Sequence, residues 1–387
     1  MKKGSYLYYA LANGMFYYAW GTFACIISVY LAGIGFIATD ISLITSAAPL
    51  FAIFFQPVCG ILADKVGSPK KVGMASLIFA VISGILFAYT KNLILLFLFN
   101  GLTQGFLNGT TALTDRLATG APYPFGTIRI WGSICYAIAC QVTGYVYDNL
   151  SHQAIYIIFT IAIIITIIGF IGMNDVQKIK SEKKEESFTV LEMLKALFTN
   201  KAFVIFMIIY ILFQGPASAN GVYMPLLIKE LGGSTTLVGT TLLFSTLSEI
   251  PAVLFSDQLI KKIPYKYLML FACILTIIRF VWYSTYPTPT MIMMMFFFQG
   301  LTTIIFILVA VRIILDIVDE RFVNSAYGIS SMLAKGVAAF VFQMLSGNII
   351  DAFGGAEGFR MVYLMYSVSI LIATIVCIMF KMPEHSK

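Results

Sequence analysis

The chain has 387 residues, of which 59% are hydrophobic and only 11% are charged. A soluble protein carries about 25% charged residues, so this composition excludes soluble enzymes and nucleic-acid-binding proteins. The net charge of +7 is spread over many loops and does not form one basic face. Apolar stretches of about 18 residues or more recur along the sequence, and each is long enough to cross a bilayer core of about 30 Å. A polytopic membrane protein is therefore expected.

The apolar stretches predict an all-α integral membrane protein with two six-helix halves. In chain order, the expected transmembrane helices are 5–33, 41–65, 72–90, 93–117, 125–147, 154–173, 201–228, 235–259, 266–285, 290–317, 323–350 and 358–381. The only long polar stretch, 174–200, predicts a cytoplasmic linker that is helical around 190–197. It separates an N-terminal half, 1–173, from a C-terminal half, 201–387. A weak repeat between Phe125–Asp148 and Tyr327–Asp351, about 200 residues apart, favours two related halves.

The positions of lysine and arginine predict how the chain is oriented. Eighteen of the 25 basic residues lie in the tails and in the loops after even-numbered helices, and three lie in the opposite loops. Basic loops stay on the cytoplasmic side of a membrane. Both termini are therefore expected in the cytoplasm, with the protein in the cell membrane.

The most specific pattern lies in the loop between the second and third helices. It reads Gly60-x-Leu-Ala-Asp64-Lys65-x-Gly67-x-x-Lys70. Gly67 permits a positive φ and the proline at 69 ends a helix, so a tight turn is expected there. Two interpretations are open for this loop. It is either a basic hairpin without a further role, or an element that acts in gating.

Four ionisable residues lie at matching depths on neighbouring helices. Asp115 and Arg129 are equally far from the turn at 121–124, about 10 Å into the membrane at a rise of about 1.5 Å per residue. Glu249 and Arg279 are equally far from the turn at 264, about 22 Å in, near the bilayer centre. Charges inside a bilayer are expensive and indicate a functional site, although buried structural ion pairs remain an alternative for both pairs.

Further polar and aromatic residues lie at membrane depth. Lys335 lies near the middle of the eleventh helix, where it would reach Glu249 if the eighth and eleventh helices line one cavity. Arg312 and Asp316 are an i, i+4 pair on the tenth helix, suited to a stabilising bridge or a gate. Gln299 is a candidate for solute binding. Tyr17 and Tyr136 are aromatic residues that either stack on a solute or only pack.

The sequence offers little for chemistry other than transport. Its six cysteines lie in or beside apolar runs without metal-ligand spacing, and both histidines, His152 and His385, lie in a loop or tail. No catalytic residue, metal site or cofactor is therefore expected. A multispan membrane enzyme would need clustered carboxylates or histidines at one membrane face. A sensor built on a transporter fold would need a soluble domain longer than the linker. Both remain weaker alternatives.

Two motifs carry a resemblance to a known family. The loop at 60–70, with Leu50–Pro57 before it, resembles the signature loop of the major facilitator superfamily. Phe125-Gly126-x-x-Arg129-x-Trp131-Gly132 resembles the fifth-helix motif of its lactose permease branch, which includes oligosaccharide and nucleoside proton symporters. The resemblance implies that Arg129 binds solute and that Tyr136 stacks on it. It implies that Glu249 binds solute and couples proton movement, beside Arg279 and Lys335.

The chain departs from that branch at three places. A solute-binding glutamate of the fourth helix is replaced by Thr111, although Asp115 matches a second acid there. The His-x-x-Glu pair of the tenth helix is replaced by Gln299 and Thr302. The seventh-helix acid is replaced near Asn220 by neutral residues. The resemblance therefore implies a monomeric secondary transporter for a sugar, oligosaccharide or nucleoside, with proton symport through Glu249. An uncoupled facilitator or an efflux pump is the alternative.

Overall fold

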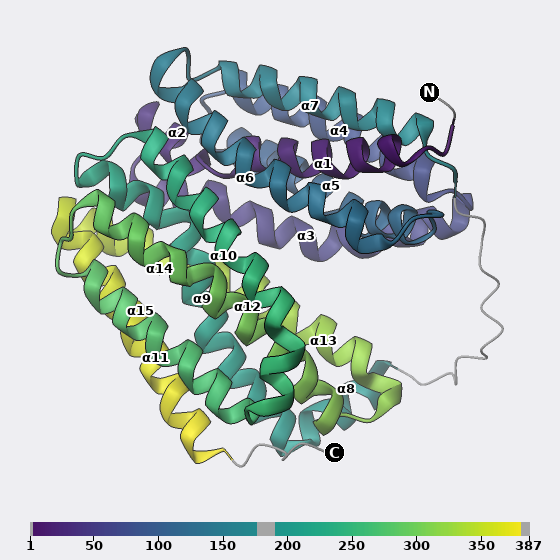
Figure 1. Cartoon of the computed structure of the whole chain (residues 1–387). Helices are drawn as coiled ribbons and strands as arrows, with labels where there is room; N and C mark the ends of the chain where they lie inside the picture. Colours follow the sequence, from purple (N-terminus) through teal and green to yellow (C-terminus); the bar gives the residue numbers. More distant parts are fainter. Residues whose placement is uncertain (1–2, 176–189, 381–387) are drawn as a thin grey trace. The chain divides into compact units, whose positions relative to one another are not determined.

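The computed structural model describes residues 3–175 and 190–380, except the side chains of 190, 191, 250–262, 320 and 324. Most of the linker predicted at 174–200 therefore lies outside the described residues. Within them the chain is helical and contains no strand (Figure 1). By packing it divides into two units, Met1–Lys180 with Ile228–Leu243, and Ser181–Leu227 with Phe244–Lys387.

The helices of the first unit follow the expected apolar stretches. They are α1 (Tyr6–Ala24), α2 (Ile27–Gly33), α3 (Ala38–Val66), α4 (Pro69–Tyr89), α5 (Leu93–Thr119), α6 (Phe125–Asn149) and α7 (Ala154–Gly172). The helix expected at 5–33 is interrupted, because Ile26 leaves the helical range with φ −123° and ψ 18°.

The second unit contains the remaining helices. They are α8 (Val190–Thr199), α9 (Lys201–Glu230), α10 (Thr235–Lys262), α11 (Tyr265–Tyr283), α12 (Pro289–Ile317), α13 (Val323–Ser331), α14 (Ala339–Phe353) and α15 (Gly355–Met379). The helix expected at 323–350 is continuous, but Met332–Ala338 between α13 and α14 is wound as a π-helix, labelled η2. The end of α9 and the start of α10 belong to the first unit by packing.

Ten of the described helical segments are long and apolar enough to cross a membrane. Helices α6 and α10 are not among the ten, although they have 25 and 28 residues. Helix α6 includes Arg129 and several hydroxyl-bearing residues, whereas the side chains of 250–262 in α10 lie outside the described part of the chain. The all-α membrane fold is thus confirmed, and the count of twelve crossings stays a prediction.

Glycines bring α3 and α5 close together in the first unit. Gly101, Gly105 and Gly109 recur every fourth residue on one face of α5, where Phe51, Phe55 and Cys59 of α3 lie against them. A Cβ added to Gly109 would lie 2.5 Å from the Cys59 sulfur and 3.0 Å from the Phe55 carbonyl oxygen. Small residues at this spacing let helix backbones approach closely, which is how helices associate where lipid supplies no hydrophobic driving force.

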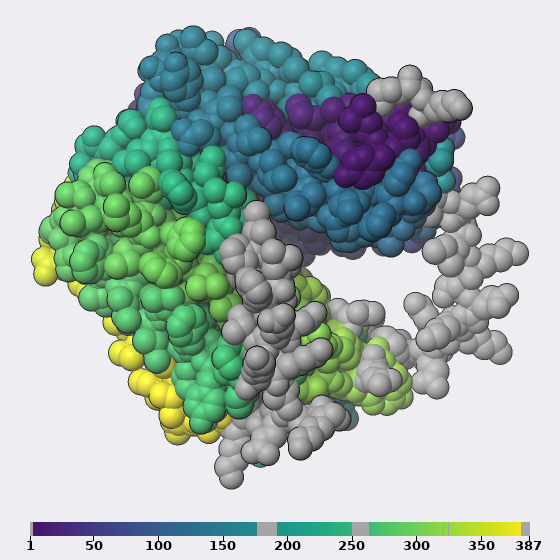
Figure 2. Space-filling view, in the orientation of Figure 1, coloured from purple at the N-terminus to yellow at the C-terminus, as the bar shows by residue number. Residues whose placement is uncertain are grey.

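Helix α1 lies between two neighbours in the same unit. It packs against α6 and α7, and its purple atoms border the blue and teal ones in the space-filling view (Figures 1 and 2). Gly169 of α7 meets the backbone of Ala12 so closely that an added Cβ would lie 2.8 Å from it. Tyr17, which contacts Arg129 of α6, lies on the side of α1 that packs against α6.

Candidate functional site

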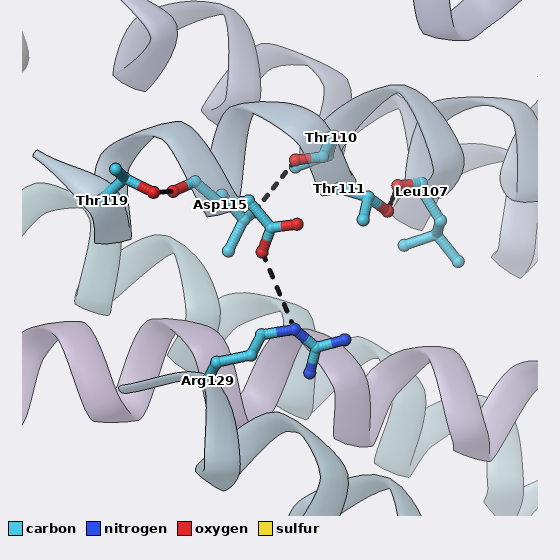
Figure 3. A network of polar contacts seen from close by, with 7 residues as sticks. Leu107, Thr110, Thr111, Asp115, Thr119 and Arg129 are labelled. Atoms are coloured by element: carbon cyan, nitrogen blue, oxygen red, sulfur yellow. Dashed lines mark hydrogen bonds and ion pairs between the residues drawn. The ribbon is translucent and has the colours of Figure 1, made fainter. Parts of the chain in front are cut away.

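Asp115 of α5 and Arg129 of α6 point toward each other (Figure 3). Their Oδ1 and Nε atoms are 3.8 Å apart. That separation exceeds the usual hydrogen-bond distance of about 2.7–3.2 Å. The two groups therefore form an ion pair without a hydrogen bond between these atoms, and both atoms are able to bond to another group. The turn at 121–124 joins the two helices and places both residues at one level, as counting from the turn predicts.

The Arg129 guanidinium also lies over an aromatic ring of α1. Its central carbon is 4.1 Å from the centroid of the Tyr17 ring, a cation–π contact. Tyr17 in turn stacks on Trp20 at 5.9 Å between centroids. The aromatic ring, the ion pair and the planar guanidinium fix the orientation of the Arg129 donors, which suits the binding of a polar group.

Tyr136 lies two turns further along α6, half-buried against α1. Its ring and carbonyl oxygen are each 3.2 Å from the Cβ position of Gly21. Glycine at 21 therefore allows α1 to approach α6 beside Tyr136. The structure brings Tyr17, Asp115 and Arg129 into one cluster, which we call the Arg129 cluster, and Tyr136 lies on the same pair of helices.

Asn13 lies one turn before Tyr17 on α1 and was not predicted from the sequence. Its side chain is buried at 1% exposure, and neither of its polar atoms has a hydrogen-bond partner among the described residues. A lone asparagine in an apolar helix is the signal that was available, because polar residues inside a membrane mark functional positions.

The predicted signature loop forms a tight turn. Gly67 has φ +71° and ends α3, and the Ser68 side chain accepts a hydrogen bond from the Lys71 amide at the start of α4. Lys70 donates from Nζ to the carbonyl oxygens of Ile171 and Met173, at 2.7 and 2.9 Å, and so ties α4 to the end of α7. Gly60 has open space where a Cβ would stand, and Lys65 is exposed.

Asp64 of the same loop pairs with Arg116 of α5 at 2.7 Å. The side chains are 61% and 34% exposed, and exposed ion pairs contribute at most about 1 kcal/mol. We therefore expect Asp64→Asn to lower the free energy of unfolding by less than about 1 kcal/mol. Melting in detergent, compared with Arg116→Gln and the double variant, checks this. A loss above that bound would show that the pair is a main support of the fold; a transport defect in a stable Asp64→Asn protein would indicate gating.

A second polar cluster lies in the second unit, on α9, α12 and α15. Tyr363 donates to Asn220 at 3.0 Å, and the Asn220 amide donates to Gln299 at 3.4 Å. The next residue, Gly300, lies against α10, where an added Cβ would be 2.8 Å from the Glu249 side chain. Glu249 of α10 therefore packs against Gly300 of α12. We call Asn220, Gln299 and Tyr363 the Gln299 cluster.

Arg279 lies deep in α11 at 2% exposure. Its central carbon is 5.1 Å from the Phe280 ring, and its Nε and Nη1 atoms have no hydrogen-bond partner within the described part of the chain. These contacts do not include the expected partner Glu249, so that pairing stays a prediction.

The other predicted residues are more scattered. Lys335 is half-buried in the π-helical segment η2, a kind of irregularity frequent at functional sites. Arg312 and Asp316 are both exposed on α12. Their gating role stays a prediction.

A family model described as the MFS_1 like family matches residues 7–361, which is most of the chain. The chain belongs to this family of major facilitator superfamily transporters. It is a transporter and not an enzyme, since its relatives are permeases and transporters.

Known sugar permeases are similar to the whole chain or to part of it. A maltose permease of Geobacillus stearothermophilus is 24% identical over 378 residues, which cover 96% of this chain and 93% of the relative. A sucrose permease of Escherichia coli is 28% identical over 162 residues, covering 38% of this chain and 39% of the relative.

Solved structures of this superfamily share the fold. The nucleoside transporter NupG matches with a TM-score of 0.84 at 19% identity, covering 97% of this chain and 99% of that one. A D-xylose–proton symporter matches with a TM-score of 0.72 at 12% identity, covering 98% and 97%.

Proposed function

We propose that the protein moves a small polar organic solute across the cytoplasmic membrane by alternating access, with proton symport. A sugar, an oligosaccharide or a nucleoside is the solute class. The observation that carries this proposal is the Arg129 cluster, in which an arginine held by an aromatic ring and a carboxylate lies on helices of a transporter fold. The maltose and sucrose permeases and the nucleoside transporter support the solute class by the solutes that their names state.

This proposal assigns a role to each predicted site residue. Arg129, with Tyr17 and Tyr136, binds the solute by donated hydrogen bonds and by stacking. Gln299 and Lys335 add polar contacts from the second unit. The proposed moving parts are two six-helix halves, 1–173 and 201–387, joined by the linker 174–200. Both termini are proposed to be cytoplasmic. The loop from Gly60 to Lys70 and the pair Arg312 and Asp316 act in gating. The protein acts as a monomer.

Glu249 is the proposed proton carrier. It lies near mid-helix beside Gly300, within the same unit as Arg279 and Lys335. Positive groups near a carboxylate favour its charged form, and burial favours its neutral form. Protonation of Glu249 would shift the equilibrium between inward-open and outward-open conformations if the two conformations bind the proton with different affinities.

Uncoupled transport, as facilitated diffusion or efflux, is the second candidate. The specific observation in its favour is the neutral pair on α12, where Gln299 replaces a histidine of the lactose permease branch and Thr302 replaces a glutamate. The Thr302 hydroxyl donates to the carbonyl oxygens of Phe298 and Gln299, which belong to its own helix.

Solute-driven proton uptake distinguishes the two candidates. Protein in liposomes with an internal pH-sensitive dye is exposed to maltose, sucrose, xylose and uridine. We expect one solute to acidify the lumen with wild type and with Glu230→Gln, an exposed control, but not with Glu249→Gln. Solute entry without acidification, at a rate indifferent to a pH gradient, would replace symport by facilitated transport.

A further inference from the structure

Asn13 is a buried polar residue that the described contacts do not explain. It lies on α1 at 1% exposure, and both Oδ1 and Nδ2 are without a hydrogen-bond partner. A buried amide in this state is unfavourable, because it has left water and gained nothing in exchange. Its presence in an otherwise apolar stretch of α1 points to a partner that comes from outside the chain.

Gly132 of α6 brings Asn13 and Arg129 close to each other. A Cβ at this position would lie 2.7 Å from Asn13 Oδ1, 2.7 Å from Arg129 Nη1 and 2.6 Å from the Tyr17 ring. The two polar atoms are therefore at most twice 2.7 Å apart, a span that one oxygen atom bridges by hydrogen bonds of ordinary length. The missing side chain at 132 keeps the three groups converging on one point.

The chemistry of the two polar atoms selects the group that bridges them. Asn13 Oδ1 is an acceptor and requires a donor, whereas Arg129 Nη1 is a donor and requires an acceptor. A hydroxyl group is both. An anionic group is disfavoured, because the Asp115 carboxylate already lies 3.8 Å from Arg129 Nε and offsets its charge.

We propose that Asn13 is a solute-binding residue that, with Arg129, holds one hydroxyl group of the solute against Gly132. The hydroxyl donates to Asn13 Oδ1 and accepts from Arg129 Nη1, while the Tyr17 ring lies beside it. This inference rests on the proposed transport of a hydroxylated solute. It assigns to α1 a direct contact with solute and makes Asn13 a determinant of specificity.

Asn13→Leu is the central variant, with Asn100→Leu as its matched control. Asn100 is also 1% exposed, but its amide donates to the Ile44 carbonyl oxygen at 2.7 Å and so joins α5 to α3. We expect Asn13→Leu to raise the KM for transport at least tenfold and to leave the melting temperature unchanged or higher. Asn100→Leu should lower the melting temperature and leave KM unchanged. A purely structural role of Asn13 would give the Asn100 result at both positions.

Deoxy analogues test the contact itself. Whichever of maltose, sucrose, xylose or uridine wild type transports is compared with its monodeoxy analogues in both proteins. One analogue should be transported at least tenfold less efficiently than its parent by wild type. The same analogue should lose a smaller factor in Asn13→Leu, where only the Arg129 contact to the hydroxyl remains. If every analogue loses the same factor in both proteins, Asn13 does not bind a hydroxyl group.

Gly132→Ala supplies an independent variant that leaves Asn13 in place. The added methyl group would lie 2.6–2.7 Å from the Tyr17 ring, Arg129 Nη1 and Asn13 Oδ1 and push these groups apart, so KM should rise at least tenfold. An unchanged KM in Gly132→Ala would overturn the inference even if Asn13→Leu failed to fold. If wild type transports none of maltose, sucrose, xylose and uridine, the proposed function fails first and the inference fails with it.

Discussion

Arg129→Ala should reduce transport by at least about 100-fold while the protein remains folded. A hydrogen bond from a charged donor contributes about 1.5–3 kcal/mol, and Arg129 offers two or more to a solute, so their loss corresponds to this factor. Arg129→Lys keeps the charge beside Asp115 but loses the planar fork and its fit to the Tyr17 ring, so about a tenfold loss is expected. Initial rates of solute uptake in liposomes measure both effects.

The control for Arg129→Ala removes the carboxylate as well. The single variant leaves Asp115 unpaired at membrane depth, which costs stability apart from any effect on solute. Arg129→Ala combined with Asp115→Asn should restore the melting temperature and not the transport rate. Transport restored by the double variant would mean that Arg129 acts only by balancing Asp115.

Gly109→Leu should prevent the first unit from folding. A Cβ at 109 would already lie 2.5 Å from the Cys59 sulfur and 3.0 Å from a backbone carbonyl oxygen of α3, and leucine adds a further branch. Backbone cannot move aside as a flexible side chain does, so α3 and α5 must separate. Overpacking typically costs about 1–3 kcal/mol, and a forced separation of two helices costs more. Size-exclusion profiles and melting in detergent measure the loss.

Gly221→Leu is the matched control for this prediction. Gly221 also lies inside a long helix, α9, and no atom of the described residues stands within 4 Å of its Cβ position. The melting temperature should be unchanged or higher, since glycine in a helix interior is about 1 kcal/mol less favourable than alanine. Equal melting temperatures for the 109 and 221 variants would show that the α3–α5 approach is not what holds the first unit together.

Helix positions were predictable from hydropathy because lipid requires long apolar segments with all backbone groups bonded internally. The helix expected at 93–117 is α5, Leu93–Thr119, and that expected at 290–317 is α12, Pro289–Ile317. The break at Ile26 and the π-helix at Met332–Ala338 were not predicted. The pattern of apolar residues does not indicate where a continuous hydrophobic segment departs from α-helical geometry.

The candidate site was predictable only where a short turn fixes the geometry. Asp115 and Arg129 flank a four-residue turn, and the same number of residues separates each of them from the turn centre. Counting residues from the turn therefore predicts that they lie at the same level. Arg279 and Glu249 are also symmetric about a turn, but equal depth does not specify which faces of α10 and α11 meet. Asn13 carries no charge and no motif, so only its burial without a partner singles it out.

Counterflow tests the central claim most directly. Liposomes are loaded with unlabelled solute and diluted into a trace of the same solute carrying a radioactive label. A carrier that binds one solute molecule per cycle must accumulate the label transiently above its external concentration. We expect this overshoot with wild type for maltose, sucrose or uridine, and its absence with Arg129→Ala. Label that only rises to the external concentration, or the same overshoot in both proteins, would contradict solute transport through the Arg129 cluster.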